Sequence, residues 1–305
     1  MEWPTPDGGA PATPSAVWHS DRARGTPWAA AEGRVASDAV AATLDDKLGV
    51  LEDELRRLGR VVVAFSGGAD SAFLAAVAQR TLGDGAHAVT AVSPSLAGDE
   101  EVDCRALAQE WGLRWTPVAT DEMARAAYRV NDLDRCYHCK AELMDVVGPI
   151  AAAEGATVVL GVNVDDLGDH RPGQRAADER GAVFPLVRAG FTKADVREAS
   201  RGMGLRTADK PAAACLASRI PYGTEVTVAL LGQVERAEAA LRRMGFGQLR
   251  VRHYGDTARI ELPTEDLVRA ASQADQIVAA VERCGYRYVT LDLAGFRSGN
   301  LNPPA

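Results

Sequence analysis

The sequence predicts an α/β protein with a doubly wound parallel sheet and a smaller C-terminal α+β domain. Between residues 61 and 162, short apolar strands alternate with helical segments, which is typical of a parallel sheet with helices on both faces. After Tyr222-Gly223 the order changes to helix, strand, strand, helix and strand. We therefore predict a disordered tail over 1–44, a larger domain over 45–222 and a smaller domain over 223–305.

The individual elements follow from apolar periodicity. A helix from Lys47 to Leu58 places its leucines on one face and leads into a strand from Val61 to Phe65. The larger domain continues with strand, helix, strand, helix and strand: Val89 to Val92, Glu100 to Trp111, Arg114 to Val118, Lys140 to Ala153 and Thr157 to Val162. The smaller domain comprises Val226 to Met244, Leu249 to His253, Ala258 to Leu262, Glu265 to Arg283 and Tyr288 to Leu293.

The composition limits the classes of partner. The net charge is -8, with Lys+Arg 34 against Asp+Glu 42, so a general grip on a polyanion is not expected. The N-terminal stretch lacks the basic start and apolar core of a signal peptide, and no run is long enough to span a bilayer. We therefore expect a cytoplasmic protein that binds neither nucleic acid nor membrane.

A glycine-containing loop follows the first predicted strand. The segment from Ser66 to Ser71, SGGADS, ends the strand and opens a helix, so its backbone N–H groups lie where a helix N-terminus stabilises an anion such as pyrophosphate. It lacks the Lys of a Walker A motif and the glycines of a Rossmann fingerprint. An ordinary strand-to-helix turn would use similar residues. Ligands of parallel sheets bind beyond the carboxyl ends of the strands, and Ser93 follows the second strand there.

This loop resembles the SGGxDS signature of the PP-loop ATP-pyrophosphatase superfamily. The resemblance implies that ATP is cleaved between its α and β phosphates, with Mg²⁺, to leave an adenylated substrate and pyrophosphate. The residues that it places at ATP are Ser66, Gly67, Gly68, Asp70, Ser71 and Ser93. Asp70 is the expected Mg²⁺ carboxylate, because an acid among phosphates is costly unless a cation lies between them.

Three of the five cysteines are candidates for chemistry. Cys136 and Cys139 form a C-x-x-C pair that we expect in a loop just ahead of a helix. Such a pair is compatible with zinc, with a redox pair, with an iron–sulfur cluster or with packing. With Cys215 as a third ligand, the donors suit a cluster with one open iron, or zinc with His138.

Cys215 is also a plausible nucleophile. Arg219 and Lys210 are nearby in the sequence, and a cation close to the thiol would lower its pKa. Cys104 and Cys284 lie in or at the end of predicted helices, and we expect them to pack. An odd number of cysteines without an export signal argues against a disulfide framework.

The segment ACLASRIPYG over residues 214–223 looks like the hallmark segment of the LarE-type sulfur transferases, which build the nickel-pincer nucleotide cofactor of lactate racemase. Two further segments look like parts of that family: Asp165-Asp166 with Asp169, Arg171, Pro172 and Gly173, and Leu291-Asp292-Leu293-Ala294-Gly295-Phe296-Arg297-Ser298-Gly299. The resemblance runs from about residue 45 to 302 and leaves the tail outside.

The resemblance implies a substrate, pyridinium biscarboxylic acid mononucleotide, whose ring carboxylates become thiocarboxylates. A carboxylate oxygen is a poor leaving group, so adenylation must precede attack by sulfur. In one version of the family, the residue matching Cys215 attacks the adenylate as a thioester-forming nucleophile and ends as dehydroalanine. In another version, three cysteines hold a [4Fe–4S] cluster whose open iron carries a sulfide. Because Cys136, Cys139 and Cys215 are all present, we favour the cluster.

The phosphate of such a substrate needs a cationic site. Arg250 and Arg252 lie two residues apart on one predicted strand, so both face the same side, and Arg259 on the next strand can join them. A solvated strand face is the alternative. The candidates for this site are Ser218, Arg219, Glu238, Arg250, Arg252 and Arg259, with Glu238 orienting the arginines.

Other functions would use the same loop. A tRNA thiolation enzyme often carries iron or zinc cysteines, but the acidic charge and the absence of a second C-x-x-C count against it. An ammonia-using synthetase needs no cysteine in its site, and a regulatory nucleotide-binding protein would release no pyrophosphate. The resemblance further implies a small-molecule nucleotide as partner, a homo-oligomer formed through the C-terminal domain, and handover to the nickel-insertion protein of the same pathway.

Overall fold

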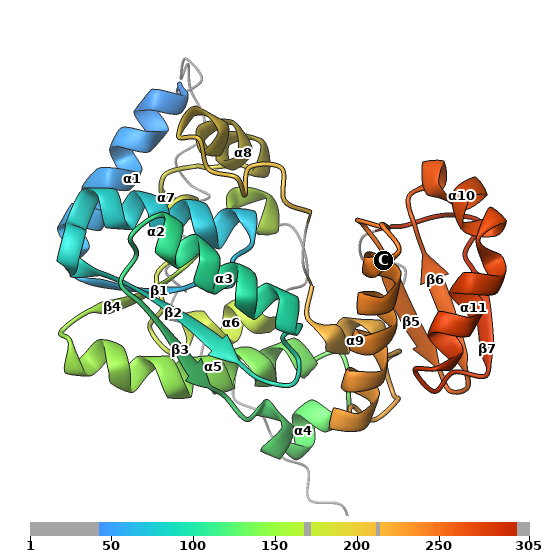
Figure 1. The fold of residues 1–305 in the computed structure, drawn as a ribbon. Coiled ribbons are helices and arrows are strands. Elements are labelled where there is room, and N and C mark those ends of the chain that lie inside the picture. The colour runs from blue at the N-terminus through green and yellow to red at the C-terminus, as the bar shows by residue number, and fades with distance from the viewer. Residues whose placement is uncertain (1–42, 168–171, 212–213, 298–305) are drawn as a thin grey trace, which may run out of the picture. The chain divides into compact units, whose positions relative to one another are not determined.

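The computed structural model describes residues 43–167, 172–211 and 214–297. Its larger sheet is parallel, in the order β3-β2-β1-β4 (Figure 1). The strands are Val61–Ala64 (β1), Ala86–Val92 (β2), Trp115–Ala119 (β3) and Thr157–Leu160 (β4). The parallel α/β class predicted from the sequence is confirmed. The predicted tail lies outside the described residues as far as position 42.

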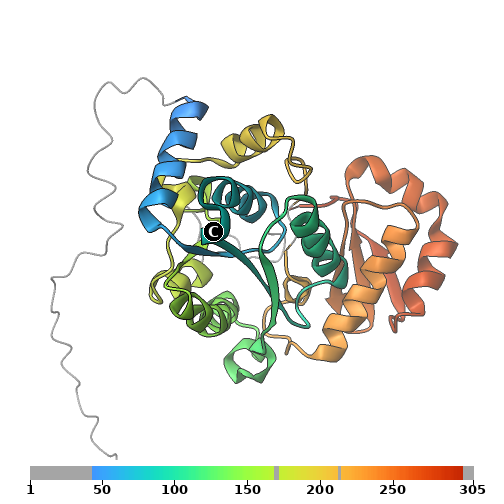
Figure 2. The same cartoon turned by 60° about the vertical axis from the view of Figure 1, so that its left-hand side comes forward.

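Helices cover both faces of this sheet because the side chains of each strand alternate in direction. Val61 and Val63 pack into one core, and Val62 packs into the other. The first core is shared with α1 (Leu44–Leu58), α2 (Ala69–Leu82), α3 (Gly98–Glu110), α7 (Pro185–Arg188) and α8 (Lys193–Gly202). The second is shared with α5 (Arg135–Ala153) and α6 (Pro172–Asp178). Figures 1 and 2 show α2 and α5 on opposite sides of the sheet.

A second sheet follows in the order β5-β6-β7. β5 (Arg250–Tyr254) pairs antiparallel with β6 (Thr257–Glu261), and β6 pairs parallel with β7 (Tyr288–Leu291). Its helices are α9 (Val228–Arg243), α10 (Leu267–Ser272) and α11 (Ala274–Glu282). Apolar side chains of α9 and α11 form one core with this sheet. The division of the chain into domains at residue 222 stays a prediction.

Two predicted elements are wrong in detail. Helix α5 begins at Arg135, so the C-x-x-C pair lies within its first turns and not in a loop. Helix α6 packs closely against this extra turn, since a Cβ at Gly173 would lie 3.1 Å from Cys136 O. The helix expected over Glu265 to Arg283 is divided into α10 and α11, since Gln273 leaves helical geometry at φ -107° and ψ 21°. Within the described ranges, no helix has the length and apolar character needed to cross a membrane.

Strand β4 and helix α2 approach each other closely at Gly161. A Cβ at this position would lie 2.7 Å from Ser71 N and 2.8 Å from Asp70 C, well inside van der Waals contact. Only glycine fits there without movement of the backbone. The start of α2 is therefore held against the carboxyl end of β4.

We expect Gly161→Ala to destabilise the protein by about 1–3 kcal/mol, because the added methyl group forces backbone atoms apart. Gly49→Ala is the matched control: Gly49 lies in α1, nothing lies within 4 Å of a Cβ added there, and alanine is favoured over glycine in a helix by about 0.5–1 kcal/mol. Midpoints of urea unfolding measure both changes. An unchanged midpoint for Gly161→Ala would show that the approach is looser than described.

Candidate functional site

The loop after β1 has the geometry of a phosphate cradle. Gly67 has φ +70°, a conformation that glycine adopts without strain. The Ser71 hydroxyl accepts from Ser66 N at 3.2 Å and donates to Gly68 O at 3.2 Å. Because the N-cap of α2 is Gly68, no side chain of the cap bonds the first turn, and its N–H groups can serve an anion. Binding of ATP by these residues stays a prediction.

Asp70 lies half-buried in the first turn of α2. Asn163 Nδ2 donates to its Oδ1 at 3.0 Å. Burial raises the pKa of Asp70 above its usual value, and the carboxylate of Asp166 raises it further, against the hydrogen bond from Asn163. A divalent cation would offset both unfavourable effects, so Asp70 and Asp166 fit Mg²⁺ in donor chemistry.

Ser93 follows β2 and is bound to a buried carboxylate. Its Oγ donates to Glu122 Oε1 at 2.5 Å and accepts from Ser95 N at 3.2 Å. Glu122 is 2% exposed and also accepts from Thr120 Oγ1 at 3.3 Å. The Ser93 side chain is thus occupied, and its carbonyl accepts from Leu96 N at 3.0 Å; contact of Ser93 with a nucleotide stays a prediction. Sequence reasoning misses Glu122, because it lies after β3 in a segment without a motif.

The structure brings the three candidate cysteines together. Cys136 and Cys139 lie in the first turns of α5, and Cys215 is the N-cap of the 3₁₀-helix Leu216–Arg219. Burial and then the neighbouring thiol of Cys215 raise the pKa of Cys139 to about 12, and Cys136 acts in the same direction. Cys139 and Cys215 pack against one cluster of buried side chains around Tyr128.

These thiols fit an iron–sulfur cluster in kind and number, since three cysteines can hold a cluster with one open iron. Across the described part of the chain, however, no group of three or more His, Cys, Asp or Glu side chains is arranged to hold one metal ion. To hold a cluster, the cysteine side chains would therefore have to rearrange. The carboxylates near the glycine loop must likewise be completed by ATP oxygens or water to hold Mg²⁺.

The segment that carries Cys215 is bonded on both sides to the carboxyl edge of the parallel sheet. Lys210 Nζ donates to Gly67 O at 3.1 Å, and Leu216 N donates to Ser95 O at 2.9 Å. Lys210 also donates to two carboxylates of α3, at 2.7 and 2.6 Å. Cys215 is therefore carried between the glycine loop and the loop after β2.

Asn131 and Arg135 join the C-x-x-C helix to the chain that follows Cys215. Asn131 is fully buried with φ +58°, and its Nδ2 donates to three main-chain carbonyls over residues 220–224 at 2.8 to 3.3 Å. Arg135 Nη1 donates to Asn131 Oδ1 at 2.6 Å and to Ala217 O at 2.9 Å. Burial opposes the charge of Arg135, but the thiols of Cys215 and Cys136 raise its pKa above the usual value. Sequence reasoning misses both residues, because neither belongs to a recognisable spacing.

Arg219 supports the Cys215 segment through the backbone. Its Nη1 donates to Cys215 O at 3.0 Å, while Nε and Nη2 donate to the fully buried Glu238 at 2.8 and 3.0 Å. Sequence analysis expects Arg219 or Lys210 to be the cation beside the thiol. Both side chains bond to carboxylates, Arg219 to Glu238 and Lys210 to Glu100 and Asp103, and an effect of either cation on the thiol stays a prediction.

The remaining candidate arginines gather on the second sheet. Arg252 lies directly opposite Arg259 in the β5–β6 register, so the predicted shared face is confirmed. Both pair with Glu261 at 2.8 Å, and Arg252 also donates to Ser218 O at 2.9 Å. Burial and then the charge of Arg219 lower the pKa of Arg250 to about 10. Binding of a substrate phosphate by this group stays a prediction.

The other two cysteines pack, as expected. Cys104 is completely buried in the core beside the glycine loop, and burial raises its pKa to about 11. Cys284 Sγ donates to Ala280 O at 3.3 Å.

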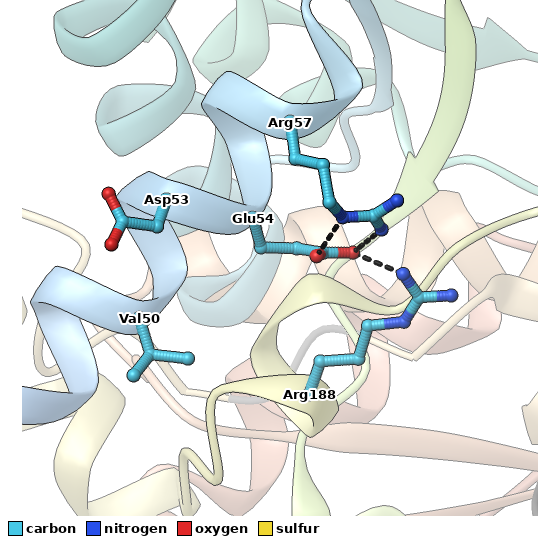
Figure 3. Close-up of a pocket in the computed structure, with 5 residues that line it drawn as sticks. All are labelled: Val50, Asp53, Glu54, Arg57 and Arg188. Carbon is cyan, nitrogen blue, oxygen red and sulfur yellow. Dashed lines mark hydrogen bonds and ion pairs between the residues drawn. The ribbon is translucent and has the colours of Figure 1, made fainter.

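A depression of about 320 Å³ on the surface contains none of the candidate residues (Figure 3). It is lined by Val50, Asp53, Glu54, Arg57 and Arg188. Glu54 pairs with both arginines, so its charge is already compensated within the protein. We assign no function to this depression.

The two further segments that look like parts of the LarE-type family are only partly covered by the described residues, and several of their residues lie outside. They are Asp169, Arg171, Ser298 and Gly299. Of the same segments, Pro172 and Gly173 open α6 against the C-x-x-C helix. Asp165 accepts from Lys193 N at 2.8 Å and so fixes the start of α8.

We expect Asp70→Asn to stabilise the ligand-free protein at pH 7. The pKa of this carboxyl is raised in the folded state, so stability is lost as the pH rises through the unfolded and then the folded pKa, and the amide removes that loss. The gain should be on the order of 1 kcal/mol at pH 7 and should vanish below about pH 3, where the carboxyl is protonated in both states. Urea unfolding at both pH values measures it, with the exposed Asp84→Asn as control. A loss of stability of Asp70→Asn at pH 7 would contradict the inference that the environment of the Asp70 carboxylate is unfavourable.

The chain is similar to curated proteins over most of their length, although no protein-family model matches it. An uncharacterised protein of Synechocystis sp. is 47% identical over 262 residues, which cover 85% of this chain and 98% of that protein. An uncharacterised protein of Methanocaldococcus jannaschii is 26% identical over 243 residues, which cover 78% of this chain and 91% of that protein. The pyridinium-3,5-bisthiocarboxylic acid mononucleotide synthase of Lactiplantibacillus plantarum is 40% identical over 264 residues, which cover 86% of this chain and 95% of that protein. With this identity and coverage, the chain belongs to the family of pyridinium-3,5-bisthiocarboxylic acid mononucleotide synthases, the LarE-type sulfur transferases.

Proposed function

We propose that this enzyme uses ATP to convert the carboxylates of pyridinium biscarboxylic acid mononucleotide to thiocarboxylates in nickel-pincer nucleotide synthesis. The name of the Lactiplantibacillus plantarum relative supports the product class. The observation that carries the proposal is the attachment of the Cys215 segment, through Lys210 to Gly67 and through Leu216 to Ser95. This attachment keeps the candidate sulfur chemistry beside the loop where an adenylate would form.

The first proposed step is adenylation. The N-terminus of α2 and the loop from Ser66 to Ser71 bind the phosphates of ATP, and the backbone at Ser93 binds the nucleotide. Asp70 would hold Mg²⁺, which would supply positive charge against the phosphates. A carboxylate oxygen of the substrate attacks the α-phosphorus, pyrophosphate departs, and the carboxyl group gains AMP as a good leaving group.

The second proposed step is the entry of sulfur at Cys215. The positions of Cys136 and Cys139 about one turn apart on α5, and the packing of Cys139 and Cys215 against one cluster of buried side chains, support the three cysteines as ligands of a [4Fe–4S] cluster. Such a cluster would supply sulfide and allow repeated turnover. Without a cluster, Cys215 would give up its own sulfur once.

The substrate phosphate is proposed to bind at the arginines of the second sheet. Glu238 and Glu261 orient these largely buried side chains, which supports a preorganised cationic group. The link from Arg252 to Ser218 O joins that group to the Cys215 segment. The residues proposed to form the site are Ser218, Arg219, Glu238, Arg250, Arg252 and Arg259.

Anaerobic purification followed by iron and acid-labile sulfide analysis tests the source of sulfur. The intact mass is taken before and after incubation with ATP, Mg²⁺ and the dicarboxylate nucleotide. We expect about four irons per chain and no loss of mass. Absence of iron with a loss of about 34 Da, the mass of H₂S, would establish sacrifice of Cys215 instead. If no pyrophosphate forms, the proposed function fails.

A double variant separates the two steps. Cys136→Ser with Cys139→Ser should remove the iron and lower sulfur transfer by at least roughly 100-fold, since losing a ligand costs more than losing an outer-shell partner, while pyrophosphate release is retained. Cys284→Ser is the matched control and should retain both. Sulfur transfer at the wild-type rate in the double variant would exclude the cluster.

A further inference from the structure

Arg135 is a buried cation beside the candidate reactive sulfur. Its residue is 5% exposed, and its guanidinium lies 5.5 Å from the ring centroid of Tyr222. It directly precedes Cys136 in α5, and its Nη1 donates to the carbonyl of Ala217, two residues after Cys215. The family resemblance and the C-x-x-C spacing assign it no role.

Arg135 differs from its buried neighbours in having no carboxylate partner among the described residues. Arg219 pairs with Glu238, and Arg252 pairs with Glu261. Arg135 donates only to the uncharged oxygens of Asn131 and Ala217. A buried cation is costly unless an anion compensates it, so this guanidinium is suited to an anionic group that arrives with a ligand.

The guanidinium also keeps donors for such a group. Both hydrogen bonds that Arg135 makes to the described chain come from Nη1. An arginine side chain has five N–H donors in a fixed plane. The N–H donors of Nε and Nη2 therefore remain for a ligand. The bonds of Nη1 hold the plane in one orientation, which is the preorganisation that stabilises developing charge most effectively.

We propose that Arg135 is a catalytic residue that binds the oxyanion formed when sulfur attacks the adenylated carboxylate at Cys215. This rests on the proposed function, because it requires an adenylate. The electron pair of the attacking sulfur, whose proton has already passed to solvent, forms the C–S bond while the carbonyl pair moves to oxygen. When that pair returns, the C–O bond to AMP breaks and AMP leaves with its electrons. Arg135 stabilises the negative oxygen between these events.

The alternative is that Arg135 has a purely structural role. The hydrogen bonds of Asn131 help to distinguish this role from the catalytic one. Asn131 alone makes the three hydrogen bonds to the carbonyls over residues 220–224. Arg135 adds one main-chain contact, to Ala217 O, and one hydrogen bond to Asn131 Oδ1. The turn after Cys215 is therefore held largely without the charge of Arg135, and removal of that charge should affect the reaction more than the fold.

Single-turnover kinetics of Arg135→Gln test the proposal. We expect formation of the thiocarboxylate to slow by about 100- to 1000-fold, the usual effect of losing one oxyanion donor, while pyrophosphate release stays close to the wild-type rate. Arg135→Lys keeps the charge without the planar fork and should slow sulfur transfer by roughly tenfold. The matched control is Arg129→Gln, since Arg129 donates to Met123 O at 2.6 Å and pairs with Glu225 at 3.6 Å; both rates should be unchanged.

Each outcome has a distinct meaning. Unchanged sulfur transfer in Arg135→Gln overturns the inference, and so does an equal fall of both rates together with a lower unfolding temperature, which is the signature of a structural contact. If Arg135→Gln does not fold, Arg135→Lys serves as the test. The inference is overturned if the ratio of the sulfur-transfer rate to the pyrophosphate-release rate in Arg135→Lys equals that of the wild-type protein. If the wild-type protein itself releases no pyrophosphate, the proposed function fails independently of Arg135.

Discussion

Parallel pairing of the larger sheet is the constraint on which the candidate site depends. Because β1, β2, β3 and β4 all end at one edge, the loops that leave them are collected there. The glycine loop, Ser93 and Glu122 reach this edge from three different strands. The Cys215 segment then only has to attach to two of these loops to bring sulfur chemistry beside them.

The sequence predicts the parts of the structure that depend on short-range pattern. Alternation of strand and helix predicts the sheet, period-two spacing predicts that Arg250 and Arg252 share a face of β5, and the register places Arg259 opposite Arg252. The turn at Gly67 follows from residue types that allow positive φ. The start of α5 is missed, because close packing of Gly173 against it is a tertiary contact that periodicity does not contain.

Contacts between distant segments could not be predicted in the same way. Glu122, Asn131 and Arg135 acquire their roles only when the chain folds, since each bonds to a segment far away in sequence or sits in a stretch without a motif. The partners of the predicted arginines are equally hidden: spacing indicates where Arg252 points but not that Glu261 compensates it. Roles at ATP, metal and substrate stay predictions for the same reason, because they depend on ligands.

The Arg219–Glu238 pair also restricts how this site can evolve. Glu238 is fully buried and accepts from Arg219, from Arg242 and from Val251 N. Loss of one member of a buried pair costs about 3–5 kcal/mol, which is a large part of the stability of a typical domain. Stepwise replacement therefore passes through an unstable intermediate, so Arg219 and Glu238 should be exchanged jointly or not at all, and relatives that lack one should lack the other.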